Sequence, residues 1–176
     1  MSQELIRVST VIAHLYPGSL DFVQQHHLDE GTRKHELMEL WVNDMLFGEN
    51  PVEPAGEIRP ITEWLEAKRI ELISAEERTN HKYGFTGKPD ARVEWNGEKW
   101  IFDWKFAESL SEQNRMQLTV YSKFHGDNVA LVQCNKAGKV NVVRVKPDPV
   151  LWAAFLSGLG VLRFQQSRKL GVFNGQ

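Results

Sequence analysis

The spacing of apolar residues in the first third of the chain predicts two helices. Apolar side chains at helical spacing predict a short helix from Ser9 to Tyr16, with Ser9-Thr10 as its N-cap. From Gly31 apolar residues recur at i, i+3, i+4 and i+8, which predicts an amphipathic helix that ends near Phe47. The buried stripe of this helix is expected to be Leu37, Leu40, Trp41 and Met45.

The middle of the chain predicts a connection, a third helix and a pair of strands. Three prolines between Asn50 and Pro60 indicate a connection, and helical spacing resumes over 61–69. The segments 71–79 and 90–95 have the composition of strands. Asn96-Gly97, which follows directly, is a strong signal for a two-residue hairpin turn. A return strand is therefore expected up to Phe106.

The second half of the chain predicts two helices around two strands. Ser109-Leu110-Ser111-Glu112 matches a capping box, and the apolar spacing after it predicts a helix from about Ser111 to His125. Strands are expected over 129–134 and 140–145, and a terminal helix over 147–170. Helices and strands thus alternate along the chain, which favours an α/β fold.

Length and composition are those of a soluble globular protein. The 176 residues suit one domain, 1–176, and 41% of them are hydrophobic while 25% are charged. No apolar run approaches the roughly 20 residues of a membrane span, so we expect a cytoplasmic protein with no membrane partner. Cys134 is the one cysteine, which excludes an internal disulfide. The net charge of −2 means that any contact with nucleic acid uses a local basic patch or bound cations.

The predicted hairpin brings two carboxylates together. If its loop is Asn96-Gly97, paired residues have numbers that sum to 193, so Asp90 lies opposite Asp103. Strand alternation puts both carboxylates on a polar face, together with Lys105 two residues beyond Asp103. The other face is apolar, and Ile101 is the one exception to the alternation. The polar face consists of Asp90, Arg92, Glu94, Lys99, Asp103 and Lys105, and the apolar face of Ala91, Val93, Trp95, Trp100, Phe102, Trp104 and Phe106.

This pair of carboxylates favours a metal site over a purely structural hairpin. Directly opposed residues have Cβ atoms about 5 Å apart, where two carboxylates repel each other. A divalent cation between Asp90 and Asp103 removes the repulsion, and Mg²⁺ is commonly held by one or two carboxylates plus substrate phosphate and water. The ammonium of Lys105 can reach a phosphate or the attacking water. The arrangement is therefore suited to phosphodiester hydrolysis.

Four short motifs, in this order, resemble the PD-(D/E)XK nuclease superfamily. The first is Gly31-Thr32-Arg33-Lys34-His35-Glu36, which is similar to a helix start in the RecB-like branch of that superfamily. The others are Gly87-Lys88-Pro89-Asp90, Phe102-Asp103-Trp104-Lys105 and Gln117-Leu118-Thr119-Val120-Tyr121. The resemblance covers roughly residues 9–124, and its nearest type is a phage-type exonuclease of the RecB-like branch.

The resemblance implies a role for each matching residue. Asp90 and Asp103 are expected to bind Mg²⁺ or Mn²⁺, with His35 and the carbonyl of Trp104 as further ligands, and Lys105 to position or polarise the attacking water. Gln117 and Tyr121 lie on one helical face and are expected to contact the active site or the DNA backbone. A strand glutamate often precedes the Asp90 motif in such proteins. The additional candidates are Glu76 or its neighbour Glu77 on a strand, and Glu36 or Glu39 beside His35.

The resemblance also implies a fold and a function. The expected fold is α/β, a central mixed β-sheet flanked by helices with a restriction-endonuclease-like α-β-β-β-α-β core. The expected function is a metal-dependent DNA nuclease, an exonuclease that hydrolyses phosphodiester bonds with a metal-activated water in DNA recombination, repair or phage replication, in a bacterial or phage-infected cell. A structure-specific endonuclease or resolvase, and an inert DNA-binding module, remain alternatives. The partners are DNA and either further copies of the chain or a recombination protein.

Five basic residues flank the expected site in sequence and are candidates for positioning DNA. They are Arg33, Lys34, Lys88, Arg92 and Arg115.

Overall fold

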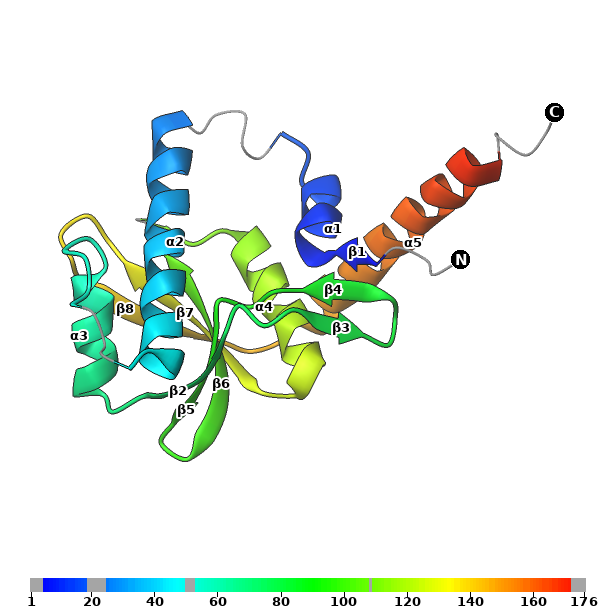
Figure 1. The fold of residues 1–176 in the computed structure, drawn as a ribbon. Helices are drawn as coiled ribbons and strands as arrows, with labels where there is room; N and C mark the ends of the chain where they lie inside the picture. The colour runs from blue at the N-terminus through cyan, green and yellow to red at the C-terminus, as the bar shows by residue number, and fades with distance from the viewer. Residues whose placement is uncertain (1–4, 19–24, 50–52, 108, 172–176) are drawn as a thin grey trace.

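The structure, a computed structural model, describes residues 5–18, 25–49, 53–107 and 109–171 (Figure 1). In chain order its elements are β1 (Ile6–Arg7), α1 (Val8–Leu15), α2 (Gln25–Phe47), α3 (Arg59–Ala67), β2 (Glu71–Ala75), β3 (Thr79–His81), β4 (Phe85–Gly87), β5 (Ala91–Trp95), β6 (Glu98–Lys105), α4 (Glu112–His125), β7 (Asn128–Cys134), β8 (Val140–Val145) and α5 (Pro149–Gly171).

The strands form two mixed sheets. The larger sheet has the order β2-β5-β6-β7-β8, in which β6 and β7 run parallel and the other neighbours are antiparallel. Helix α4 makes the crossover between β6 and β7 that a parallel pair requires. The smaller sheet has the order β1-β4-β3, with β1 parallel to β4 and β3 antiparallel to it.

Helices cover both faces of the larger sheet (Figure 1). On one face α2 and α3 bury a core that includes Met38, Ile61, Phe102 and Trp104. On the other face α1, α4 and α5 pack into a second core, to which strand β6 contributes Ile101. Strand β6 is therefore buried from both sides, which explains why its alternation of apolar and polar residues is broken at Ile101.

The predicted fold class is confirmed. The core order α-β-β-β-α-β is present as α3, β2, β5, β6, α4 and β7, with β3 and β4 inserted between β2 and β5. The sequence did not predict the small sheet, because its strands have only two or three residues each. In the part of the chain that the structure describes, no helix has both the length and the apolar character needed to cross a membrane.

The predicted starts of the first two helices were wrong. Helix α1 begins at Val8 with Arg7 in the N-cap position and no side-chain cap, so Ser9-Thr10 does not cap it. The chain enters this helix directly from β1, whose pairing with β4 sets the start. Helix α2 begins at Gln25, six residues before Gly31, which lies inside the helix.

The predicted stripe of α2 was also partly wrong. Leu40 is 67% exposed and Met45 is 40% exposed. The buried positions are Met38, Trp41 and Val42. Both sets fit helical spacing and both contain Trp41, so only packing against the sheet decides which of them is buried.

Two further predictions, the start of the third helix and the undivided strand 71–79, differ from the structure. Residues 50–52 of the expected connection lie outside the described residues, and α3 begins at Arg59, with Pro60 in its first turn, two residues before the predicted start at Ile61. The predicted strand 71–79 is divided: β2 ends at Ala75, and β3, which belongs to the other sheet, begins at Thr79. Glu76 has a positive φ of 44°, a conformation that ends the extended strand.

The capping box of α4 uses different residues from those predicted. Ser111 is the N-cap; its hydroxyl accepts from the backbone N–H of Asn114, and the Asn114 side chain accepts from the N–H of Ser111. Ser109 and Glu112 are not the pair. The helix itself, Glu112–His125, agrees with the prediction and ends at Gly126, whose φ of 74° is typical of a C-terminal cap.

Candidate active site

The hairpin that carries the candidate site has the predicted register. Asn96 and Gly97 both have positive φ, 54° and 76°, as a two-residue type I′ turn requires. Trp95 pairs with Glu98, and the later pairs sum to 193 up to Ala91 with Phe102. Asp90 is the residue just before β5, so it lies one position beyond the last pair of the ladder.

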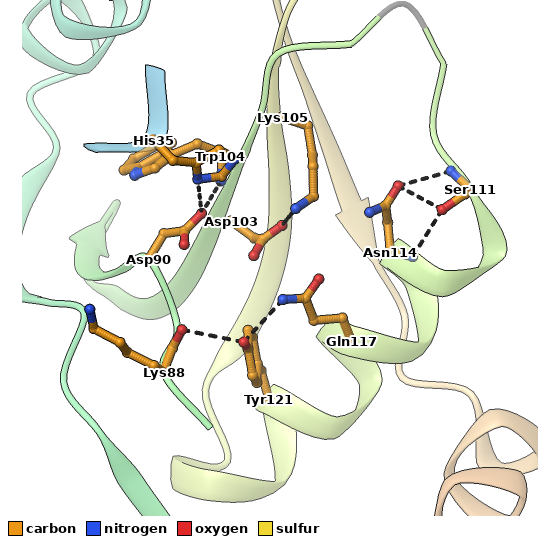
Figure 2. Close-up of polar contacts among 10 residues, drawn as sticks. All are labelled: His35, Lys88, Asp90, Asp103, Trp104, Lys105, Ser111, Asn114, Gln117 and Tyr121. Atoms are coloured by element: carbon orange, nitrogen blue, oxygen red, sulfur yellow. Dashed lines mark hydrogen bonds and ion pairs between the residues drawn. The ribbon is translucent and has the colours of Figure 1, made fainter. Parts of the chain in front are cut away.

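Asp90 is bound to the backbone of β6. Its Oδ2 accepts a hydrogen bond of 2.8 Å from the N–H of Trp104. Strand β6 continues beyond the last residue pair that it forms with β5, so the N–H of Trp104 has no β5 carbonyl opposite it. The Asp90 carboxylate accepts this N–H in place of a backbone carbonyl. Figure 2 shows the Asp90 side chain next to that of Asp103, so the hairpin does bring the two carboxylates together.

Buried Asp103 and half-buried Lys105 form an ion pair on the side of the sheet that α4 covers. Lys105 Nζ lies 2.7 Å from Asp103 Oδ2, and the Asp103 side chain is 2% exposed (Figure 2). Apart from this ion pair, no hydrogen bond to Asp103 Oδ2 is found among the described residues. Lys105 offsets part of the cost of burying the carboxylate, and the repulsion from nearby Asp90 favours a further cation at the pair.

Burial and charge shift both members of this pair. Burial raises the pKa of the Asp103 carboxyl and nearby Asp90 raises it further, although Lys105 acts in the opposite direction. Burial alone would lower the pKa of the Lys105 ammonium, but Asp103 and Asp90 outweigh it, so that pKa is raised. Lys105 is therefore a charged hydrogen-bond donor at neutral pH.

His35 reaches the pair from helix α2. Its Nδ1 lies 3.4 Å from Asp90 Oδ2, and its ring meets Phe106 edge-on at 5.6 Å between centroids. Glu36 is exposed, and no contact with Asp90 or Asp103 is found for it within the described ranges. Of these two neighbours on α2, His35 is the one whose side chain lies next to Asp90.

Glu76 lies beside the site and Glu77 does not share its contacts. The backbone N–H of Glu76 donates to the carbonyl of Asp90 at 3.1 Å, and its carboxylate forms an ion pair with Lys88. Lys88 also contacts Glu39 of α2 at 3.3 Å. Glu77 instead lines a small pocket with Pro89 on its wall. Glu76 is thus the glutamate joined to the Asp90 loop.

Gln117 and Tyr121 connect helix α4 to the segment that precedes Asp90. The Gln117 amide donates to the Tyr121 hydroxyl at 3.0 Å, and this hydroxyl donates to the carbonyl of Lys88 at 3.3 Å (Figure 2). Burial, and then the charge of Asp103, raises the pKa of Tyr121, which keeps the hydroxyl protonated as this donor role needs. A Cβ on Gly87 would lie 2.6 Å from the Phe124 ring and 3.0 Å from the Tyr121 ring, so the close packing of α4 on this strand favours glycine there.

The donor set suits a hard divalent cation but does not enclose one by itself. The candidates are the oxygens of Asp90 and Asp103 and a nitrogen of His35, which lies 3.4 Å from Asp90 Oδ2. Across the described part of the chain, no three His, Cys, Asp or Glu side chains form a ready-made ligand cluster. Mg²⁺ is usually held by one or two carboxylates together with substrate phosphate and water, so these residues fit such an ion.

A basic pocket beside the site was not predicted. It has a volume of about 280 Å³, and Arg7, Arg78 and Lys88 contribute its cationic side chains, with Tyr121 on its wall. Arg7 and Arg78 have no acidic partner among the described residues. No sequence signal could have found this pocket, because its arginines come from distant segments that only the small sheet and α1 bring together.

Four of the five basic residues proposed from sequence to position DNA are paired with carboxylates. Arg33 is paired with Glu57, Lys34 with Glu30, and Arg92 with Asp127. These pairs, and those of Lys88 with Glu76 and Glu39, compete with DNA phosphates for the four cations. Lys88 does line the basic pocket.

The comparisons with known proteins give structural relatives only. No family model matches the chain, and no curated protein matches it. The alkaline exonuclease LHK-Exo from Laribacter hongkongensis is similar in structure, with a TM-score of 0.59 and 13% identity over 97% of this chain and 91% of that chain. The chain has the fold of that exonuclease. This agrees with the resemblance to phage-type exonucleases drawn from the motifs.

Two further structures have the same exonuclease fold. LHK-Exo in complex with dAMP has a TM-score of 0.59 and 13% identity, over 96% of this chain and 91% of that chain. A phage-related exonuclease from Haemophilus somnus 129PT has a TM-score of 0.53 and 13% identity, over 96% of each chain. At such low identity the likeness concerns the fold, and the chemistry must be judged from this chain's own residues.

Proposed function

We propose that this chain is a metal-dependent DNA nuclease that acts as an exonuclease. The observation that carries the proposal is the cluster of Asp90, Asp103 and Lys105, in which two neighbouring carboxylates and an ammonium meet at a largely buried position. Support also comes from the fold, which is that of two proteins named as exonucleases, one of them studied in complex with dAMP. The inferred substrate is therefore DNA.

In this proposal the acidic pair holds Mg²⁺ or Mn²⁺. Asp90 and Asp103 supply oxygen ligands, and His35 and the carbonyl of Trp104 are the further candidates. When bound, such a cation activates water for attack on a phosphodiester and offsets the negative charge that develops. Glu76 remains an additional candidate near Asp90, whereas Glu36 is the weaker one because its side chain is exposed.

The chain's own residues prepare the site for hydrolysis. The Trp104 N–H fixes the orientation of the Asp90 carboxylate, and Lys105 stands beside Asp103 as a donor to a water or a phosphate oxygen. Gln117 and Tyr121 hold the backbone of Lys88, two residues before Asp90. Arg7 and Arg78, the cations of the basic pocket that have no acidic partner among the described residues, bind a further phosphate of the DNA.

The test is a cleavage assay on two DNA substrates. End-labelled linear duplex and closed circular DNA are incubated with Mg²⁺, Mn²⁺ or EDTA, using wild type, Lys105→Ala, Asp103→Ala and the control Lys99→Ala. Lys99 lies on the same strand but is exposed and remote in register from Asp103. We expect metal-dependent loss of the linear DNA, reduced roughly 10²–10⁴-fold by Lys105→Ala and unchanged by Lys99→Ala.

The other outcomes have distinct meanings. Cleavage of the circular DNA would replace the exonuclease with an endonuclease or resolvase on the same fold. Absence of cleavage with every metal and substrate would contradict the proposal and favour an inert DNA-binding module. The same proposal includes a role in recombination, repair or phage replication. It also includes a protein partner, which is either a further copy of the chain or a recombination protein. Pull-down from infected cells tests for this partner.

A further inference from the structure

The turn of the β3–β4 hairpin carries an exposed tyrosine that the proposed chemistry does not use. Tyr83 is 46% exposed, and Gly84 after it has a positive φ of 70°. In Figure 1 this hairpin lies beside α5, away from the larger sheet. An exposed aromatic ring is unremarkable by itself, so the way in which Tyr83 is held matters.

Both backbone polar groups of Tyr83 are tied down. Its N–H donates to His81 Nδ1 at 3.2 Å, and its carbonyl accepts from the guanidinium of Arg163 on α5. The first bond requires an unprotonated Nδ1. Burial, and then the charge of Lys82, lowers the pKa of His81, which agrees with a neutral ring. The turn is therefore held in one conformation by two different elements.

The ring of Tyr83 rests on an aromatic support. Its centroid is 5.1 Å from that of His81 and 6.2 Å from that of Trp152 on α5. His81 in turn stacks on buried Phe85 at 4.6 Å and 16°. One part of the Tyr83 ring thus packs on a rigid stack while the rest faces solvent. A ring held in this way loses little conformational entropy when a flat ligand stacks on it.

A lysine ammonium lies over the Tyr83 ring. Lys82 Nζ lies 5.5 Å from the Tyr83 ring centroid, and Lys82 is exposed with no acidic partner among the residues described. The basic pocket that contains Arg7 and Arg78 lies further along the same small sheet, at Thr86–Lys88. Aromatic rings and nearby cationic side chains are the combination that proteins use to bind unpaired nucleic-acid strands.

The hairpin also leads directly to the acidic pair. Tyr83 and Asp90 are seven residues apart, so at most about 25 Å separates them. Thr86, Gly87 and Lys88 of the basic pocket lie between them in the chain. One strand of DNA can therefore place a base at Tyr83, a phosphate in the pocket and another phosphate at Asp90.

We infer that Tyr83 is a stacking platform for a base of an unpaired DNA strand, with Lys82 and the basic pocket binding its phosphates. This inference rests on the proposed function, because it names the form of DNA that enters the same site. It predicts that the chain prefers single-stranded DNA, or a duplex with an unpaired end, over a blunt duplex. Every base has a π-face, so the platform is insensitive to sequence.

The test measures binding without cleavage. Fluorescence anisotropy in EDTA at fixed salt compares a labelled single strand with a blunt duplex of the same sequence, for wild type, Tyr83→Ala and Tyr83→Phe. The control is Phe47→Ala, which removes another exposed ring, on α2. Loss of one stacked base corresponds to roughly 5–150-fold weaker binding.

We expect Tyr83→Ala to weaken single-strand binding by that factor and to leave duplex binding unchanged. Tyr83→Phe, which keeps the ring, and Phe47→Ala should bind both DNAs as wild type does. Wild-type affinity of Tyr83→Ala for the single strand would overturn the inference, and so would equal losses for both DNAs. This assay measures binding in EDTA and does not depend on cleavage. If the cleavage assay showed no nuclease activity, the binding result could therefore still be interpreted by itself.

Discussion

The two sides of strand β6 differ although both are buried. Toward α2 and α3 the strand presents Phe102 and Trp104, which are at most 1% exposed in an apolar core. Toward α4 it presents Asp103 and Lys105, a charged pair next to the apolar residues of the second core. Charges buried in this way seldom stabilise a fold, so we expect this strand to contribute stability through its apolar side and the charged pair to serve the proposed chemistry.

The largest expected effect tests the apolar side. Phe102→Ala removes a fully buried ring and should lower the free energy of unfolding by about 3–5 kcal/mol, because the cavity collapses only in part. Urea denaturation in EDTA measures this loss. Ile101→Val, on the opposite side, should cost only about 0.5–1.5 kcal/mol. A loss below about 1 kcal/mol for Phe102→Ala would contradict the stabilising role of this side.

The next effect tests whether the ion pair is retained for function. Lys105→Met alone leaves the Asp103 carboxylate buried and uncompensated, so we expect a loss of about 3 kcal/mol in unfolding free energy. The double variant Lys105→Met/Asp103→Leu should return to within about 1 kcal/mol of wild type, or exceed it, while remaining inactive.

The exposed Lys99→Met is the control for this pair, with an expected change within about 0.5 kcal/mol. A double variant as unstable as Lys105→Met would show that the pair contributes to stability, and would remove the contrast between the two sides.

A smaller effect concerns the helix that covers the charged side. Ser111→Ala removes the N-cap of α4 and should lower the free energy of unfolding by about 1 kcal/mol. Ser109→Ala removes the serine that the sequence pattern had favoured, and should have no effect on the melting temperature. A larger loss of stability for Ser109→Ala than for Ser111→Ala would instead support the capping box predicted from sequence.

The smallest effect is a dependence of stability on pH. Burial raises the pKa of Asp103, so its protonated form stabilises the fold below the ordinary carboxyl pKa of about 4, and this contribution is lost as the pH rises through the raised value. Asp103→Asn cannot titrate. In EDTA its unfolding free energy relative to wild type should therefore increase between about pH 4 and pH 8.

The control for the pH series is Glu98→Gln, which removes an exposed carboxylate of the same strand. A flat or decreasing difference for Asp103→Asn would mean that the attraction of Lys105 outweighs burial at Asp103.

The parts of the fold that were predicted correctly depend on short stretches of sequence. Asn96-Gly97 determines the register of the hairpin because both residues must adopt positive φ, and the pleat then places Asp90 beside Asp103. The parallel pair of β6 and β7 follows from the strand-helix-strand pattern around α4. The predictions that failed depend on packing: the choice between Leu40 and Met38 in α2 is one, and the cap of α4 is another.

By itself, therefore, the sequence determined the α/β class, the hairpin and the pairing of its two carboxylates. These features arise from turn dihedrals and side-chain periodicity within about 20 residues. Only the tertiary structure decided that Asp103 is buried, that Tyr121 reaches the carbonyl of Lys88, and that Arg7 and Arg78 share a pocket. Each of these contacts joins segments far apart in the chain, and their meeting depends on how the helices pack on the two sheets.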